Sequence, residues 1–257
     1  MSILALKLIL SPIIIGSASL AGRRWGHAVS GWLIGLPLTS GPVIFFLALS
    51  HDTQFVMTSV LGTLSGGFSL VAFCLAYAWM SMRFRWLPAA AGSLLAYAAV
   101  VILMQNAVIP LLPLFLTVVL VILSGARLMP ARTNLPPGDA KPGAWDLPAR
   151  LLIGTGFILL LTGIAAWIGP RLTGLLATIP LYTIILTIFA HRLEGTAGAI
   201  SVLGGLLFGM YAFSAFFLTL GLLIGNTGIG WAFLSAIAVA LLVQGGSLLI
   251  LRRRNLR

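Results

Sequence analysis

Acidic side chains are nearly missing from this chain, which has 4 Asp and Glu residues against 15 Lys and Arg in 257 residues. Charged residues of both signs make up 7% of the composition, whereas a soluble domain carries about a quarter. Hydrophobic residues make up 60%, and the mean hydropathy is +1.13. No soluble core of this size hides so much apolar surface. The composition therefore excludes the soluble, disordered and fibrous classes and indicates lipid as the solvent.

Cysteine is equally scarce, since Cys74 is the only one in the chain. An intrachain disulfide is therefore excluded, and a cysteine-based metal site is not expected. Cys74 lies in an apolar run, where a cysteine behaves as a small hydrophobe. We expect neither a metal nor another cofactor.

Positive charge is the only charge present in quantity, with a formal net charge of +11. In a soluble protein this excess would suggest nucleic acid, but the sequence has no zinc-finger spacing, RNA-binding motif or long basic run. The basic residues stand in short clusters between apolar runs, which is typical of topology signals and of contact with anionic lipid. We expect membrane lipids as partners, and no nucleic acid.

Long apolar runs predict an all-α integral membrane protein, because about 20 apolar residues suffice for a helix to cross the bilayer. We place about nine such helices, at 3–21, 27–50, 54–80, 86–105, 108–126, 150–168, 171–190, 196–224 and 228–251.

Two other segments need separate interpretation. The run at 3–21 has the look of a signal peptide, but Lys7 lies inside it rather than ahead of it, so we expect it to remain as the first membrane helix. Residues 127–149 are polar and rich in proline. They are too short for a domain, and we predict a cytoplasmic linker there.

The positions of the basic residues predict the orientation of the chain in the membrane. With the N-terminus outside and the C-terminus inside, all of the 15 Lys and Arg residues except Lys7 and Arg171 fall in cytoplasmic segments. The opposite orientation reverses this distribution. We therefore predict an N-out, C-in, multi-pass protein of a bacterial inner (plasma) membrane.

Two stretches of the chain resemble each other, which points to an internal repeat. Residues 26–38 read GHAVSGWLIGLPL, and residues 169–181 read GPRLTGLLATIPL. At a constant offset of 143 residues, the following pairs coincide: Gly26 with Gly169, Gly31 with Gly174, Pro37 with Pro180, and Leu38 with Leu181.

Beyond the prolines, the best matches come at an offset of 140, which pairs His51 with His191 and Phe68 with Phe208. This change of offset predicts a three-residue gap at 39–42, and hence a helix that is more unwound in the first copy than in the second.

The repeat divides the chain into a first copy at 1–106, a connecting helix at 107–126, the linker at 127–149, and a second copy with a basic tail at 150–257. Four helices plus one make an odd number of crossings, so the second copy enters the membrane from the opposite face. The predicted architecture is a 4+1+4 inverted repeat, as in many secondary transporters.

Prolines interrupt the middle of the predicted helices at 27–50 and 171–190, and broken backbone in a membrane is tolerated mainly where it lines a cavity. We expect the two breaks to meet near the midplane, where half-helix N-termini favour an anion. The alternative is that the prolines only kink the helices. The predicted substrate-binding residues are Gly35, Pro37, Thr39, Ser40, Gly41, Pro180, Tyr182 and Thr183.

Titratable residues mark the ends of the same two helices. His51 and Asp52 follow the first, and His191 and Glu194 follow the second, on the opposite predicted face. We interpret them as gating or proton-handling groups. The alternative is that they are solvated residues that cap helices.

The function predicted from these features is secondary transport of a small organic anion or amino acid by alternating access, not enzyme catalysis. A membrane-embedded enzyme and a scaffold or assembly factor are the alternatives. No HExxH, GxSxG or paired intramembrane aspartates support the first, and the short loops argue against the second. Assembly as a homodimer is left open by the sequence.

Overall fold

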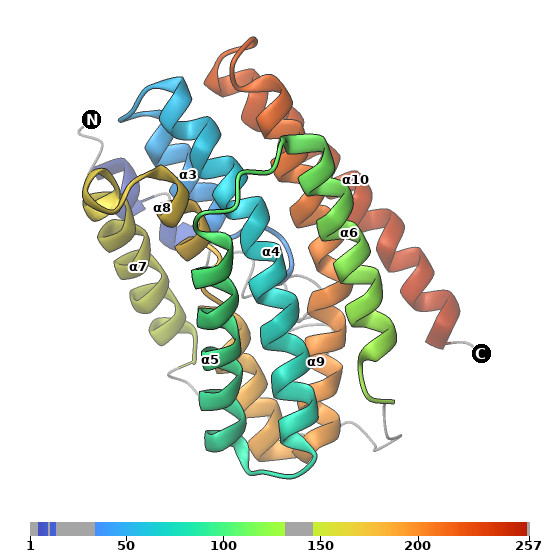
Figure 1. Ribbon diagram of the computed structural model, residues 1–257. Helices are drawn as coiled ribbons and strands as arrows, with labels where there is room; N and C mark the ends of the chain where they lie inside the picture. The colour runs from blue at the N-terminus through green and yellow to red at the C-terminus, as the bar shows by residue number, and fades with distance from the viewer. Residues whose placement is uncertain (1–4, 10, 14–33, 132–145, 256–257) are drawn as a thin grey trace.

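The computed structural model describes residues 5–9, 11–13, 34–131 and 146–255, and its regular elements are all helices (Figure 1). Residues 5–9 and 11–13 are helical. The remaining helices are α3 (Ser40–Ala48), α4 (Thr53–Ser81), α5 (Trp86–Met104), α6 (Leu111–Leu128), α7 (Asp146–Ile168), α8 (Pro170–Leu176), α9 (Leu181–Leu223) and α10 (Ile229–Asn255).

Six helical stretches of the described residues are long and apolar enough to cross a membrane: Thr53–Ser81, Trp86–Met104, Leu111–Leu128, Leu151–Ile168, Pro170–Leu223 and Ile229–Gly246. Large apolar side chains face outward along them, among them Leu95, Leu103 and Leu242, which are 69% to 76% exposed. An apolar exterior of this kind matches a lipid environment. The chain is a helical membrane protein.

The stretch Pro170–Leu223 is too long for one crossing, because its 54 residues would span about 80 Å as a straight helix. Its backbone is interrupted at 177–180, between α8 and α9. A second interruption lies inside α9, where Gly195 adopts φ 70° and ψ −159°. Such a positive φ favours glycine. We refer below to residues 181–194 and 196–223 as the first and second parts of α9.

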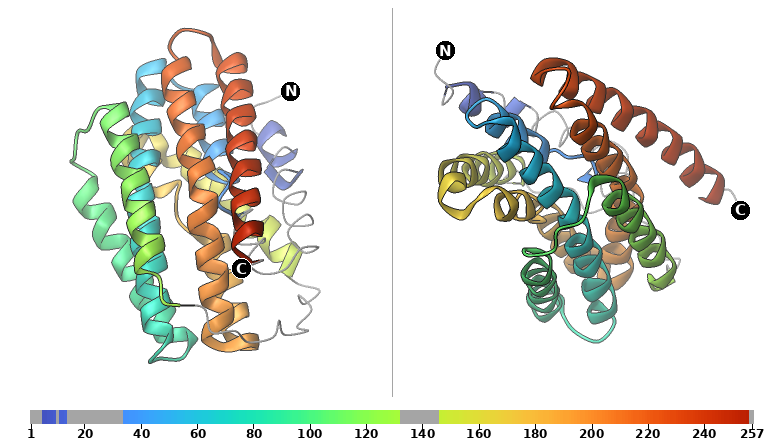
Figure 2. Two further views of the ribbon diagram at one scale, coloured as in Figure 1. Left: turned by 90° about the vertical axis from the view of Figure 1, so that its right-hand side faces the viewer. Right: turned by 45° about the horizontal axis from the view of Figure 1, so that its top comes forward.

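Helix α4 lies at the centre of the bundle. Its most apolar window is 72% buried, against 22% to 33% for the spans in α5, α6, α7 and α10. It packs against α3, α5, α6, α8 and α9. Helix α10 covers the second part of α9 at one edge, and α7 lies on the opposite side of the bundle (Figures 1 and 2).

The loop between α4 and α5 marks one end of the bundle, which we call the α4–α5 end. The Trp79 indole donates to the Leu128 carbonyl at the end of α6 (3.1 Å). The Thr196 hydroxyl donates to the Ser81 carbonyl (2.8 Å), which brings the start of the second part of α9 to the same place.

The loop between α5 and α6 marks the other end, the α5–α6 end. Here the Arg171 guanidinium of α8 donates to the Met104 carbonyl (3.2 Å) and to the Ala107 carbonyl. These bonds satisfy carbonyls that the C-terminus of α5 leaves open. The start of α4 and the end of α9 also lie here, because Gly221 approaches both Val60 and Leu111. It follows that α4 and the second part of α9 run in opposite directions (Figure 1).

Most predicted helix boundaries lie within a few residues of the observed ones. The runs at 54–80, 86–105 and 196–224 correspond to α4, α5 and the second part of α9. The first predicted helix lies largely outside the described residues, as do the first half of the second helix and most of the linker. The described part of the linker is shortened by helices, since α6 extends to Leu128 and α7 begins at Asp146.

The three-residue gap predicted after the prolines is wrong. Helix α4 begins at Thr53 and the second part of α9 begins at residue 196, so the offset remains 143. Helices α5 and α10 begin at Trp86 and Ile229, again 143 residues apart. The matches at offset 140 arise by chance in a chain with few residue types.

Helices α4 and α8 approach closely through glycines. A β-carbon at Gly174 would collide with the Ser59 carbonyl and would lie 2.7 Å from the Thr63 amide nitrogen. One at Gly62 would collide with the Arg171 carbonyl. Small residues permit this backbone contact, as is common between helices in membranes.

Replacing Gly174 with alanine should therefore lower the free energy of unfolding by about 2 kcal/mol, because backbone at the α4–α8 crossing must move. Gly163→Ala is the matched control. Gly163 is also helical, but nothing lies within 4 Å of an added β-carbon, so alanine should be neutral or stabilising there. Melting temperatures in detergent would compare the two variants. Equal effects would contradict the close crossing.

Candidate functional site

The backbone leaves the helical conformation around both predicted prolines, at residues 35–39 and 177–180. In the first break, the Leu38 amide donates to the Leu36 carbonyl across Pro37 (2.7 Å). In the second, the Leu181 amide donates to the Ile179 carbonyl across Pro180 (2.8 Å). Pro180 has φ −79° and ψ 52°, which is the geometry of an inverse γ-turn. The two breaks thus share one local structure, and their residue numbers differ by 143.

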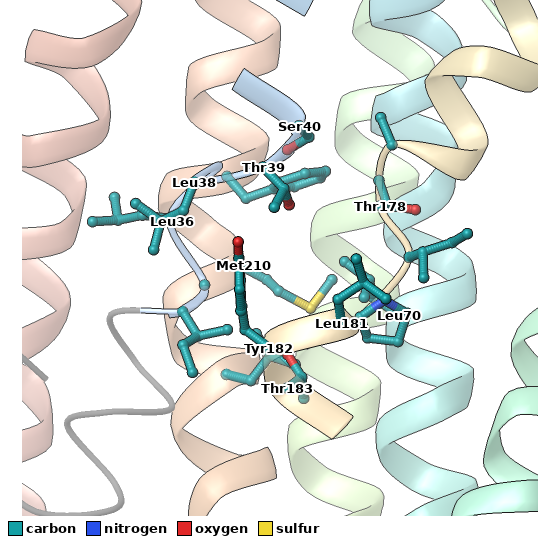
Figure 3. Close-up of a pocket in the computed structure, with 17 residues that line it drawn as sticks. Leu36, Leu38, Thr39, Ser40, Leu70, Thr178, Leu181, Tyr182, Thr183 and Met210 are labelled. Atoms are coloured by element: carbon teal, nitrogen blue, oxygen red, sulfur yellow. The ribbon is translucent and has the colours of Figure 1, made fainter. Parts of the chain in front are cut away.

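The two breaks face each other across a cavity in the interior of the bundle (Figure 3). Its lining comprises residues 34–36, 38–40 and 177–183, with Leu70 of α4 and Leu206, Met210 and Phe213 of α9. The space open to water centres is about 40 Å³, enough for a few water molecules at about 10–15 Å³ each.

The structure brings together most of the predicted substrate-binding residues. Six of them line the cavity: Gly35, Thr39, Ser40, Pro180, Tyr182 and Thr183. Pro37 and Gly41 are not part of the lining. Pro37 forms the turn of the first break, and the site of a β-carbon on Gly41 faces the Pro37 and Phe216 side chains. The Tyr182 side chain, 6% exposed, extends from the second break toward the first (Figure 3).

Sequence reasoning missed the wall that α4 and α9 contribute to this cavity. Leu70 and Phe213 both line it, and their numbers differ by 143. This correspondence was the available signal, but the incorrect gap obscured it. Thr178 was also missed, although it lies in the second break.

Each break is held against a neighbouring helix by a close backbone contact. A β-carbon at Gly35 would collide with the Gly209 backbone, and one at Gly66 would collide with the Thr178 side chain. Adding 143 to 35 and to 66 gives 178 and 209, so the same pair of positions is in contact twice.

Tyr97 of α5 anchors the second break. Its hydroxyl, 5% exposed as a residue, donates to the Leu175 carbonyl (3.0 Å) and lies 3.0 Å from the Thr178 hydroxyl. The Thr178 hydroxyl and amide also donate to the Leu175 carbonyl, at 2.7 and 3.2 Å. A carbonyl released by the break is therefore fully satisfied inside the protein, as a lipid environment requires.

Two helix N-termini are directed at the cavity. Helix α3 begins at Ser40 and α9 at Leu181, next to lining residues of the two breaks. Neither N-cap residue, Thr39 or Pro180, donates a side-chain cap to the first turn. The helix dipoles and first-turn amides therefore give this uncharged lining a positive potential, which favours an anionic group.

The four predicted gating residues lie far from the cavity, at the two ends of the bundle. Asp52 is the N-cap of α4, accepting from the Phe55 amide (2.8 Å), and the His51 ring stacks on Phe55. His191 lies with its Nδ1 3.3 Å from the Tyr77 hydroxyl, and Glu194 packs beside Gly198. The contacts of Asp52 are those of a helix cap.

Within the described residues, no group of three or more His, Cys, Asp and Glu side chains could hold a metal ion. Comparisons of the chain with protein-family models, with curated proteins and with solved structures found no significant match. The site must therefore be interpreted from its own geometry.

The hydrogen bonds of Tyr97 predict a measurable coupling with Thr178. Tyr97→Phe should lower the free energy of unfolding by about 1 kcal/mol, because one buried hydrogen bond is lost. In a Thr178→Val background the same change should cost less, with a coupling of about 0.5 kcal/mol or more. Chemical unfolding of the four proteins in the double-mutant cycle would measure it. Strict additivity would show that the two hydroxyls act separately.

Proposed function

We propose that this protein is a secondary transporter that moves a small organic anion, such as a carboxylate or an amino acid, by alternating access. The observation that carries the proposal is the convergence of two broken helices, with their N-termini, on one interior cavity. Broken helices of this kind form the solute sites of many transporters. The cavity as it stands holds only water, so a solute must bind as the walls separate.

The proposal includes an inverted repeat of about nine membrane helices. Its support is that segments separated by 143 residues run in opposite directions. Helix α3 ends at the α5–α6 end, whereas α8 begins there; α4 and the second part of α9 are likewise antiparallel, as are α5 and α10 (Figure 1). The exchanged contacts, Gly66 with Thr178 and Gly209 with Gly35, fit a pseudo-two-fold axis through the cavity.

Alternating access follows from such a repeat. Two copies with the same choice of packing arrangements can exchange conformations, which gives an inward-open and an outward-open state of similar energy. The glycine contacts between each break and its neighbouring helix are places where such a rearrangement would occur. Because all these contacts are between backbones or small side chains, little bulk opposes sliding.

The cavity lining also bears on the class of solute. It contains hydroxyls from Thr39, Ser40, Tyr182 and Thr183 beside a largely apolar wall. Hydroxyls and amides would bind one carboxylate, and the leucine, methionine and phenylalanine side chains would cover a short apolar body. This combination favours a small monocarboxylate over a multiply charged anion.

A carboxylate and its amide distinguish an anion site from a merely polar one. Propionate should stabilise the purified protein against heat more than propionamide does, because only the carboxylate gains from the two helix N-termini. Panels of other carboxylates and amino acids would follow. Stabilisation by neutral solutes alone would contradict an anion site.

Transport of the best ligand into proteoliposomes then tests the site. Pro37→Ala and Pro180→Ala should each reduce uptake by about tenfold or more, because a restored helical hydrogen bond closes the break. Tyr211→Phe is a suitable control, since Tyr211 lies on α9 outside the cavity lining. Full uptake in both proline variants would remove the breaks from the mechanism.

The proposed topology is N-terminus outside and C-terminus inside, with the α4–α5 end in the cytoplasm. That end carries Arg83, Arg85, Arg127 and Arg192, whereas Arg171 at the other end is bonded to carbonyls of the α5 terminus. The positive-inside rule favours this orientation.

Cysteine labelling tests this topology directly, because the single native cysteine, Cys74, is buried and can be replaced by serine. In that background, Asp52→Cys should react with an impermeant maleimide from outside intact cells. Glu194→Cys should react only after permeabilisation. Labelling of both from the same side would contradict the inverted repeat.

A further inference from the structure

A second cavity, independent of the central one, opens at the α4–α5 end. Its volume is about 560 Å³. It lies between the loop that joins α4 to α5 and the kink at Gly195 that divides α9. We call it the basic cleft and define it by Arg83, Arg85, Trp86, His191, Arg192 and Gly195.

The side chains of the basic cleft carry positive charge without an opposing carboxylate in the lining. Three guanidinium groups, from Arg83, Arg85 and Arg192, line it together with the His191 imidazole. The nearest acidic residue in sequence, Glu194, is not part of the lining, and its carboxylate packs beside Gly198. Three cations converging on one hollow repel each other unless an anion lies among them.

The cleft is held in shape by contacts between its two walls. The Arg192 guanidinium lies over the Trp86 ring, 5.6 Å from its centroid. The Thr196 hydroxyl donates to the Ser81 carbonyl (2.8 Å), and His191 Nδ1 lies 3.3 Å from the Tyr77 hydroxyl. A guanidinium that stacks on an aromatic ring keeps its N–H edges available for an oxyanion.

Two helices also begin at this cleft. Helix α5 starts at Trp86, and the second part of α9 starts at Thr196; both residues belong to the lining. Their N-terminal amides and dipoles add to the potential of the arginines. Guanidinium forks and helix N-termini together are the groups that proteins use to bind phosphate.

We propose that the basic cleft binds a phosphate-bearing anion. The cleft is far larger than one phosphate group and falls in the size range of ligand pockets, about 300–1,000 Å³, so it accommodates the phosphate together with the molecule that carries it. The carrier is a phospholipid headgroup or a soluble phosphate ester. Either ligand would join the α4–α5 loop to the kink of α9.

Two probes separate these sources on the full-length protein. Glycerol 3-phosphate is titrated calorimetrically in a neutral detergent without anionic lipid, against sodium chloride of equal ionic strength. In parallel, the melting temperature is measured in nanodiscs of phosphatidylcholine with and without phosphatidylglycerol. Binding of glycerol 3-phosphate assigns the site to a soluble ester. Stabilisation by phosphatidylglycerol without binding of the ester assigns it to a lipid headgroup.

Matched charge-removing variants test the location. Arg85→Gln and Arg192→Gln should each weaken the response to the active probe by about tenfold, because each loses a charge-assisted hydrogen bond. Arg127→Gln removes the same charge from the same end of the bundle but lies on α6 outside the cleft, and should change the response by less than about twofold. The melting temperatures without probe show whether each variant is folded.

Two results would overturn the proposal. One is a failure of both probes to exceed the chloride and phosphatidylcholine controls. The other is an equal loss of response in Arg127→Gln, Arg85→Gln and Arg192→Gln, which would show a diffuse effect of surface charge.

Discussion

Satisfaction of the backbone is the constraint on which this structure depends. In lipid, a carbonyl or amide released from a helix has no water to bind, so each interruption must be compensated inside the protein. Both central breaks achieve this with a turn across proline, and the second adds the Tyr97 and Thr178 hydroxyls at the Leu175 carbonyl. At the α5–α6 end, Arg171 does the same for the last carbonyls of α5. Polar side chains inside this apolar bundle thus serve mainly to permit irregular backbone.

Close helix contact follows from the same constraint, because a broken helix needs a neighbour near enough to shield it. Gly62 and Gly66 of α4 admit α8 and the second break, and Gly209 of α9 admits Gly35 of the first. The cavity is what remains between the breaks, small and lined by hydroxyls and apolar side chains. Its position near the middle of the chain's two copies makes a solute site the natural interpretation, and the basic cleft at the α4–α5 end is separate from it in place and in charge.

Much of the helical framework was predictable from the sequence, because apolar runs and their polar interruptions directly reflect the lipid environment. The breaks at Pro37 and Pro180 were also foreseeable, since proline cannot continue a helical hydrogen-bond ladder. The correspondence beyond the prolines was not, because leucine, alanine and phenylalanine match by chance in such a composition and favoured an offset of 140. Helix starts at Thr53 and Trp86, with partners at residues 196 and 229, revealed the constant offset. The wall formed by Leu70 and Phe213 and the anchor provided by Tyr97 depend on tertiary packing, which no local pattern encodes.

Tyr97 has a consequence for the balance between the two copies. The residue 143 positions later is Ala240, which has no hydroxyl to offer. The second break is therefore pinned to its neighbouring helix by a hydrogen bond that the first break has no equivalent residue to make. One such bond contributes about 1 kcal/mol, or roughly a fivefold ratio of populations. If the copies exchange roles, the chain has a built-in resting preference, and position 240 is where evolution or an engineer could remove it.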